Sequence, residues 1–301
     1  MENIEKTTLV TVIVPTLCSA NRASTLMRAL RSILEGQEPS DVGVCALVVV
    51  NGARVDETTY ESLLSMEKVR MLRLSESGVA RAQRAGRDAV NTPYFCFLDD
   101  DDELIPQSLH WRVRAMESNP SIDVLVANGY RHENGKDVPC NVIPQSREDP
   151  HEKLLRSNWL ASCSALYRTA SVRPALWDGV SNYYEFTVIA HKLMLEYKLR
   201  FDERYAYRLH DTPGSATRSD SFRAAEIPAL KKILELSLPR KIREGVEVKL
   251  GMAYHVEADR LLKNDLPRAW EYHKQSLFCP GGYRFWLYTR FFFSHRLLLR
   301  K

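Results

Sequence analysis

Four consecutive carboxylates, Asp99 to Asp102, are the side chains of this sequence that are best suited to chemistry. They directly follow the apolar run Pro93 to Leu98, which the pattern predicts as a buried strand. Open α/β sheets bind ligands beyond the carboxyl ends of their strands. Because four like charges in a row need solvent or a cation, we expect a site for a hard divalent cation with oxygen ligands. The alternative is a solvated acidic turn before a helix that starts near Pro106.

The elements that must position these acids alternate along the chain. Apolar strands are predicted at residues 9–14, 42–50 and 69–74, each followed by a segment with helical spacing. After the acids we expect a helix at 109–116, a strand at 122–127, a polar and turn-rich loop at 132–149, a helix at 183–197 and an edge strand at 200–210. This alternation predicts an α/β fold with a parallel, doubly wound sheet flanked by helices.

The spacing of apolar residues changes near Phe222, and beyond that residue only helical patterns occur. Helices are predicted at 227–238, 242–262 and 267–277. We therefore expect a first domain over residues 1–218 and a small helical domain over 219–301. Within the first, residues 9–105 form one half, which includes the acids, and residues 106–218 form a second half.

Composition sets limits on the class of protein. The sequence is 45% hydrophobic and 27% charged, which is typical of a globular protein, and a net charge of +4 is too small to argue for nucleic acid. Six scattered cysteines without a Cys-x-x-Cys pair indicate reduced thiols. No run of about eighteen apolar residues exists, and the first eight residues are polar. A cytoplasmic protein is expected.

The ends of three strands would meet along one edge of the sheet, at Pro15-Thr16, Asn51-Gly52 and Asp99. This edge offers hydroxyl, amide and carboxylate groups, which suit a nucleoside and a metal-bound diphosphate. The sequence contains neither of the glycine-rich motifs that bind phosphate, Gly-x-x-x-x-Gly-Lys and Gly-x-Gly-x-x-Gly. A cation on the acids would then stabilise the charge of a departing nucleotide, and a carboxylate from the second half would take a proton from an acceptor hydroxyl.

In this order, these motifs resemble the inverting glycosyltransferases of family 2, which have the GT-A fold. The resemblance covers roughly residues 9 to 218. It is carried by the segments Val12–Thr16, Val48–Gly52 with Asp56 and Thr58, Gly78–Gly86, and Phe97–Asp102, and the later Tyr184-Glu185 and His210-to-Ser215 elements also fit. It implies that residues 9–105 bind the nucleotide-sugar donor and residues 106–218 the acceptor. It implies a metal-dependent enzyme of the hexosyltransferase type that moves a sugar, with inversion, from a nucleotide-sugar to a hydroxyl acceptor. A glycan, a lipid-linked saccharide or a small molecule would serve as acceptor.

The resemblance also implies roles for individual residues. The aspartates occupy the DxD motif, and the predicted ligands of Mn²⁺ or Mg²⁺ are Asp99, Asp101 and His210. The predicted donor contacts are Pro15, Thr16, Asn51, Asp56, Arg81, Arg84, Asp99 and Asp100. A UDP-sugar is the first expectation. Another nucleotide stays open, because Val50 stands where the family usually has an acid that contacts the base.

The predicted general base is Glu185, the only acid in the stretch 182–186 that matches the family's acceptor-activating motif. Glu185 could equally be a first-turn acid favoured by the helix dipole. Asp178 is the alternative base, although Asp178-Gly179 is also a common turn pair.

Two other functions remain open at this point. A sugar-phosphate nucleotidyltransferase would use a similar sheet and metal, and a catalytically inactive module would bind a nucleotide-sugar without turnover. The aromatic and basic segment 283–301 suggests either peripheral contact with the inner face of a membrane or a homodimer contact. Its arginines recur every six residues, which would spread them around an α-helix.

Overall fold

A computed structural model describes residues 8–38, 40–140, 142–212 and 219–292. The described residues divide into two compact units, with the division between residues 215 and 216. The predicted domain boundary at residue 218 lies outside the described residues.

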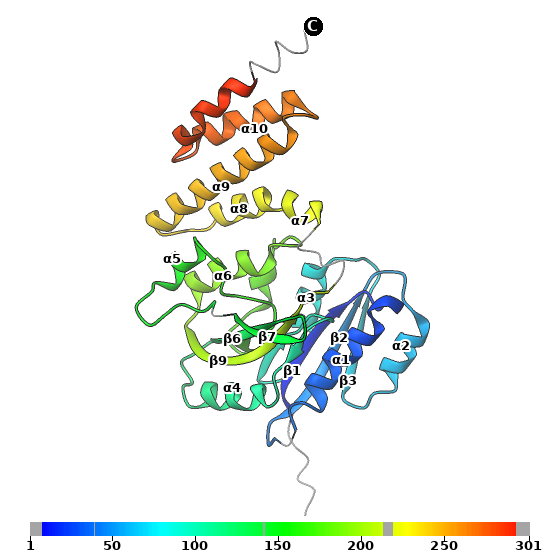
Figure 1. Ribbon diagram of the computed structural model, residues 1–301. Coiled ribbons are helices and arrows are strands. Elements are labelled where there is room, and N and C mark those ends of the chain that lie inside the picture. Colours follow the sequence, from blue (N-terminus) through cyan, green and yellow to red (C-terminus); the bar gives the residue numbers. More distant parts are fainter. Residues whose placement is uncertain (1–7, 39, 141, 213–218, 293–301) are drawn as a thin grey trace, which may run out of the picture. The chain divides into compact units, whose positions relative to one another are not determined.

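In the first unit, the strands before and at the acidic turn form a parallel array in the order β3-β2-β1-β4 (Figure 1). Their apolar runs are buried because helices cover both faces of this part of the sheet. The bounds are β1 (Thr8–Thr16), β2 (Gly43–Asn51), β3 (Val69–Leu74) and β4 (Tyr94–Phe97).

The sheet continues beyond β4 with mixed strand directions, in the order β8-β6-β9-β5. β8 is antiparallel to both β4 and β6, whereas β9 is parallel to β6 and antiparallel to β5. The bounds are β5 (Glu103–Leu104), β6 (Val124–Glu133), β7 (Lys136–Cys140), β8 (Ala165–Arg168) and β9 (Leu199–His210). The predicted α/β fold with a mostly parallel sheet flanked by helices is confirmed.

Two local predictions in the second half of this unit were wrong. Residues 200–210 are not an edge strand, because β9 lies between β6 and β5. β5 is only two residues long, so it covers little of β9, most of which stays partly exposed. Residues 132–149 were expected to be a polar loop. They contain β7, which forms a hairpin with β6.

Helices pack on the two faces of the sheet and create two apolar layers. The first-unit helices are α1 (Ala23–Leu34), α2 (Glu57–Leu64), α3 (Val79–Asp88), α4 (Ser108–Glu117), α5 (Pro150–Leu154) and α6 (Glu185–Glu196), with short 3₁₀ helices η1 (Ala20–Arg22) and η2 (Pro174–Trp177). α3 approaches the sheet at Gly86, where an added Cβ would lie 2.4 Å from Cγ2 of Ile13. Only glycine allows that approach.

The second unit is helical, as predicted. Its elements are α7 (Asp220–Ala224), α8 (Glu226–Leu234), α9 (Arg240–Leu261), α10 (Leu266–Phe278) and the 3₁₀ helix η4 (Gly282–Thr289), which is coloured red in Figure 1. All six cysteines lie in the described ranges and are free thiols, three of them buried. Among the helices described, none is both long and apolar enough to cross a bilayer.

Candidate active site

Strand register brings Thr16 to the acidic turn. Ile13 of β1 lies opposite Phe97 of β4, so the two strands end side by side. The hydroxyl of Thr16 donates to Oδ2 of Asp100 at 2.6 Å and accepts from the backbone nitrogen of Cys18 at 3.0 Å. Asp100 is buried, which raises the pKa of its carboxyl, and the Thr16 hydrogen bond opposes that rise. Two predicted donor residues, Thr16 and Asp100, are thus brought into contact.

Two arginines that follow β1 partly neutralise the acidic turn. Nη1 of Arg22 lies 2.8 Å from Oδ1 of Asp100 and 3.0 Å from Oδ2 of Asp101. The guanidinium of Arg28, on α1, donates to the backbone oxygen of Asp101. The turn is therefore held by charge-assisted hydrogen bonds, which are stronger than neutral ones.

Asp99 has no such cation beside it among the described residues. Its Oδ2 accepts a hydrogen bond from the hydroxyl of Ser162 at 2.8 Å. Burial, together with the negative charges of Asp101, Asp100 and Glu185, raises the pKa of Asp99 to about 7, and the hydrogen bond from Ser162 opposes that rise. This carboxylate is the member of the turn whose charge is least compensated.

The last acid of the quartet and its neighbour connect the turn to β9. Oδ1 of Asp102 accepts from the backbone nitrogen of His210 at 2.9 Å. The ring of His210 contacts a different acid, with Nε2 at 2.6 Å from Oε2 of Glu103. Burial raises the pKa of Asp102 well above its ordinary range, and the charge on Asp99 adds to that rise. The structure thus places His210 at the turn but directs its ring to Glu103.

Two asparagines fix the start of α3. The side chain of Asn51, at the end of β2, donates to the backbone oxygen of Thr16 and accepts from the backbone nitrogen of Gly78, both at 3.0 Å. Gly78 has a φ of 149°, in the region that favours glycine. Oδ1 of Asn182, from the loop before α6, accepts from the backbone nitrogen of Ala80 at 3.1 Å. The first turn of α3 is thus connected to both halves of the unit.

The two candidate bases lie in very different surroundings. Glu185, the first residue of α6, is 7% exposed, and its Oε1 finds no hydrogen-bond partner among the described residues. Burial raises its pKa, against the effect of backbone N–H groups. The side chain of Asp178 is 63% exposed and is ion-paired with Arg84. Asp178 is therefore solvated and already partnered, whereas Glu185 is a desolvated carboxylate whose charge interacts with that of Asp99.

Aromatic packing holds Glu185 close to the acidic strand. Phe186, the next residue, packs edge-on against Phe97 of β4 with ring centroids 6.0 Å apart. Trp177 packs on Phe97 at 5.3 Å. Since these rings are part of the buried apolar layer, they restrict how far α6 can move from β4.

The remaining predicted donor residues lie around the same edge. Pro15 is buried in β1, one residue before Thr16. Asp56 caps α2 by accepting from the backbone nitrogen of Thr59 at 2.9 Å. Arg81 is ion-paired with Glu76, and Arg84 is paired with Asp88 as well as Asp178. Each of these side chains has a local structural role in the described chain.

The chemistry of the acidic turn fits a hard divalent cation. Its carboxylate oxygens are the ligands that Mg²⁺ and Mn²⁺ prefer. The raised pKa of Asp99 reflects its burial first and the negative charge of its neighbours second, and a cation would offset that charge. Within the described ranges, however, no three His, Cys, Asp or Glu side chains are grouped so as to hold a metal ion. Asp101 faces Arg22 and His210 faces Glu103. The carboxylates of Asp99 and Asp101 thus have the chemistry that suits a cation, but His210 is not brought to them.

With this geometry in place, the family can be identified. The model of glycosyl transferase family 2 matches residues 11–173, which include both strands of the acidic site and Ser162. The chain belongs to glycosyltransferase family 2. It is therefore a glycosyltransferase, as the sequence predicted. No curated protein matches the chain.

Solved structures agree with the family 2 fold. S. aureus TarS 1-349 in complex with UDP-GlcNAc matches with a TM-score of 0.63 and 16% identity, over 89% of this chain and 79% of that chain. TarS 1-349 in complex with UDP matches with a TM-score of 0.54 and 16% identity, over 82% and 71% of the two chains. At this identity the likeness establishes the fold.

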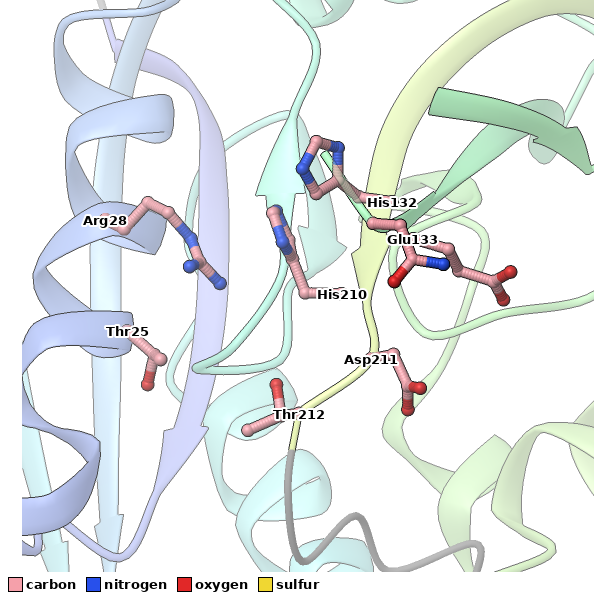
Figure 2. A pocket seen from close by; sticks show the side chains of 8 residues that line it. Thr25, Arg28, His132, Glu133, His210, Asp211 and Thr212 are labelled. Carbon is pink, nitrogen blue, oxygen red and sulfur yellow. The ribbon is translucent and has the colours of Figure 1, made fainter. Parts of the chain in front are cut away.

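A polar pocket of about 520 Å³ adjoins the family 2 site (Figure 2). Arg28 and His210 lie on opposite sides of it, and His132 lies 5.0 Å from His210 between ring centroids. Its lining residues are Thr25, Arg28, His132, Glu133, Asn134, His210, Asp211 and Thr212. The residues after Thr212 that were expected to complete the His210-to-Ser215 element lie outside the described residues.

Sequence reasoning missed two residues of this family 2 site, Arg22 and Arg28, and it missed the contact of Asn182 with the first turn of α3. A signal for the arginines was present, since a buried acidic run requires cations and both residues follow the strand beside β4. The partner of Asn182 lies 102 residues earlier in the chain. No local pattern indicates such a contact.

Proposed function

We propose that this protein is a metal-dependent inverting glycosyltransferase that uses a UDP-sugar donor and a hydroxyl acceptor, with Glu185 as general base. The observation that carries this proposal is the buried Oε1 of Glu185, without a partner among the described residues and within electrostatic reach of Asp99. A desolvated carboxylate without a partner destabilises the fold, and such perturbed carboxylates cluster at active sites.

The reaction is a single displacement. The acceptor oxygen attacks the anomeric carbon on the face opposite to the bond that links the sugar to the diphosphate. As the new C–O bond forms, the bond to the diphosphate breaks, and the departing oxygen keeps its electron pair. Glu185 takes the proton of the acceptor hydroxyl. Its raised pKa makes the ionised carboxylate a stronger base than an ordinary glutamate.

Asp99 and Asp101 would hold Mn²⁺ or Mg²⁺, which supplies positive charge to offset the negative charge of the diphosphate. His210 remains the proposed third ligand, and its ring would have to leave Glu103. Arg22 and Arg28 keep the turn in place, because they bind its carboxylates and its backbone.

The donor would lie along the edge formed by the ends of β1, β2 and β4. The proposed nucleoside contacts are Pro15, Thr16, Asn51 and Asp56, and the proposed diphosphate contacts are Arg81 and Arg84. Asp99, at the ribose or the metal, and Asp100 are the other proposed donor-binding residues. The complexes of TarS with UDP-GlcNAc and UDP support a uridine nucleotide. Because Asn51 already bonds two backbone groups, it acts mainly by positioning the strand end beside the nucleoside.

We place residues 1–218 as the catalytic domain and 219–301 as a helical domain that contributes a membrane or homodimer contact, in a cytoplasmic protein. The acceptor classes are a glycan, a lipid-linked saccharide or a small molecule. The variable second half of the first unit would select among them.

The test is a panel of nucleotide-sugars incubated with the protein, with and without Mn²⁺, with release of nucleoside diphosphate as the readout. Release of UDP from one UDP-sugar, dependent on Mn²⁺, is the expected result. Pyrophosphate formed from a nucleoside triphosphate and a sugar phosphate would instead identify a nucleotidyltransferase. Donor binding without turnover across a broad acceptor panel would identify an inactive binding module.

A further inference from the structure

The end of the described chain carries large apolar side chains that face solvent. Four large side chains are exposed in η4 and just after it. The exposed fractions are 76% for Tyr283, 67% for Trp286, 74% for Leu287 and 41% for Phe291. Large aromatic residues are normally at least half buried, so this grouping is unusual. We define these four residues, together with Arg284 and Arg290, as the η4 outer face.

The 3₁₀ geometry of η4 organises this face into rows. A 3₁₀ helix has about three residues per turn, so residues three apart lie one above the other. Tyr283 and Trp286 form one row, and Arg284, Leu287 and Arg290 form the neighbouring row. Residues six apart are therefore aligned in η4, so Arg284 and Arg290 lie in the same row. In an α-helix the same spacing would spread them around the axis. Arg296, the next in the series, lies outside the described residues.

Other side chains of η4 fix it to α9 and α10 of the same unit. The ring of Phe285 stacks on His255 with centroids 4.0 Å apart, and the hydroxyl of Tyr288 bonds Asp259. The hydroxyl of Thr289 lies 2.9 Å from Nε2 of His273. Because η4 is held by these contacts, its outer face is presented outward as a preformed surface.

All charged side chains near the end of the sequence are positive. Glu271 is the last acid, and the following residues include Arg284, Arg290, Arg296, Arg300 and Lys301. In a symmetric dimer the same surface faces itself, so Arg284 and Arg290 would meet like charges without a carboxylate from the same face. An anionic lipid surface supplies the opposite charge, and it accepts Trp and Tyr at headgroup level with Leu and Phe below.

We propose that the η4 outer face binds the surface of a membrane that contains anionic phospholipids. Tyr283, Trp286, Leu287 and Phe291 enter the interface, while Arg284 and Arg290 extend their apolar stems alongside and keep their guanidinium groups at the phosphates. The guanidinium of Arg290 already lies 5.1 Å from the ring centroid of Phe291, so charge and aromatic surface are adjacent. This inference is independent of the proposed transferase reaction, because it needs neither donor nor acceptor.

The test is co-sedimentation of the full chain with vesicles of phosphatidylcholine alone and with vesicles that also contain phosphatidylglycerol. We expect binding only to the anionic vesicles. The double variant Tyr283→Ser/Trp286→Ser should lower vesicle affinity by roughly tenfold or more, because it removes the apolar contact. Arg284→Gln/Arg290→Gln should lower affinity by about tenfold and remove most of its salt dependence.

Met252→Ser/Val256→Ser is the matched control, since both side chains are exposed apolar residues of α9 in the same unit. It should bind vesicles as the parent does. Circular dichroism and Tm verify that every variant is folded. Equal vesicle binding by parent and outer-face variants, or no binding of the parent, would overturn the proposal. So would a concentration-dependent dimer, seen by sedimentation velocity without lipid, that the outer-face variants abolish.

Discussion

Oδ1 of Asn182 accepts a hydrogen bond from the backbone nitrogen of Ala80 at 3.1 Å, across 102 residues of sequence. This contact joins the loop that carries Glu185 to the first turn of α3, which Asn51 holds against the end of β1. The side chains proposed to bind the donor and the side chain proposed to activate the acceptor are therefore parts of one hydrogen-bonded frame.

Asn182→Ala should lower kcat about tenfold while leaving donor affinity nearly unchanged. Loss of one hydrogen bond of this kind costs about 1 kcal/mol. Because the loop before Glu185 is then held less firmly, the base is also misplaced, which slows the reaction further. Tyr183, next to it, has a φ of 83°, so the loop depends on such contacts. Steady-state kinetics and donor titration are the measurements. Asn119→Ala, which removes a local surface contact to Ser121, is the control. If kcat and donor affinity both fell to a similar extent, the role of Asn182 would be to support the fold and not to position the base.

Glu185→Gln should abolish turnover and leave donor binding intact, because the amide keeps the shape of the side chain but cannot take a proton. We expect a fall in kcat of at least roughly a hundredfold, the usual contribution of a general base. Asp178→Asn is the paired variant and should retain near-parent activity, since Asp178 is exposed and bound to Arg84. If the Glu185 variant stays active and the Asp178 variant does not, the base is Asp178.

Glu185 should also make the protein less stable as pH rises. Burial raises its pKa in the folded state above the ordinary value of 4.5. The folded protein then binds a proton that the unfolded chain has lost, so the free energy of unfolding falls between the ordinary and the raised pKa. Glu185→Gln should therefore raise Tm at neutral pH but not at a pH below the ordinary value. Calorimetric scans across pH would show this, and an equal Tm difference at every pH would contradict it.

Asp101→Asn should weaken Mn²⁺-dependent donor binding by at least roughly tenfold, because an amide is a poorer ligand for a hard cation than a carboxylate. Binding measured without Mn²⁺ should change little. Asp41→Asn, which affects an exposed ion pair with Arg114, is the control. If Asp101→Asn and the parent respond identically to Mn²⁺, Asp101 is not a metal ligand.

The sequence was most informative where local pattern determines structure. The continuous apolar runs of β1 and β2 and the run before Asp99 predicted parallel strands, because strands covered on both faces are apolar throughout. The motifs placed there also predicted the family. Glu185 was predicted only through resemblance, since one acid in a first helical turn has an ordinary explanation.

Sequence reasoning failed where contacts are distant or geometry is unusual. The position of β9 inside the sheet depends on pairing with β6 and β5, and its alternation alone suggested an edge. The pairing of Arg22 with Asp100 and Asp101 depends on the register of β1 and β4. The alignment of Arg284 with Arg290 depends on η4 being a 3₁₀ helix, whereas helical periodicity is normally judged at 3.6 residues per turn.

A helix with a period of about three tolerates length changes poorly. One residue added within η4 would rotate everything after it by about 120°, a third of a turn. Arg290 would then move out of the row of Arg284, and the inward positions of Tyr288 and Thr289 would be taken by other residues. The outer face and its attachment would be lost together. In related chains that keep this surface, we therefore expect substitutions within η4 but neither insertions nor deletions.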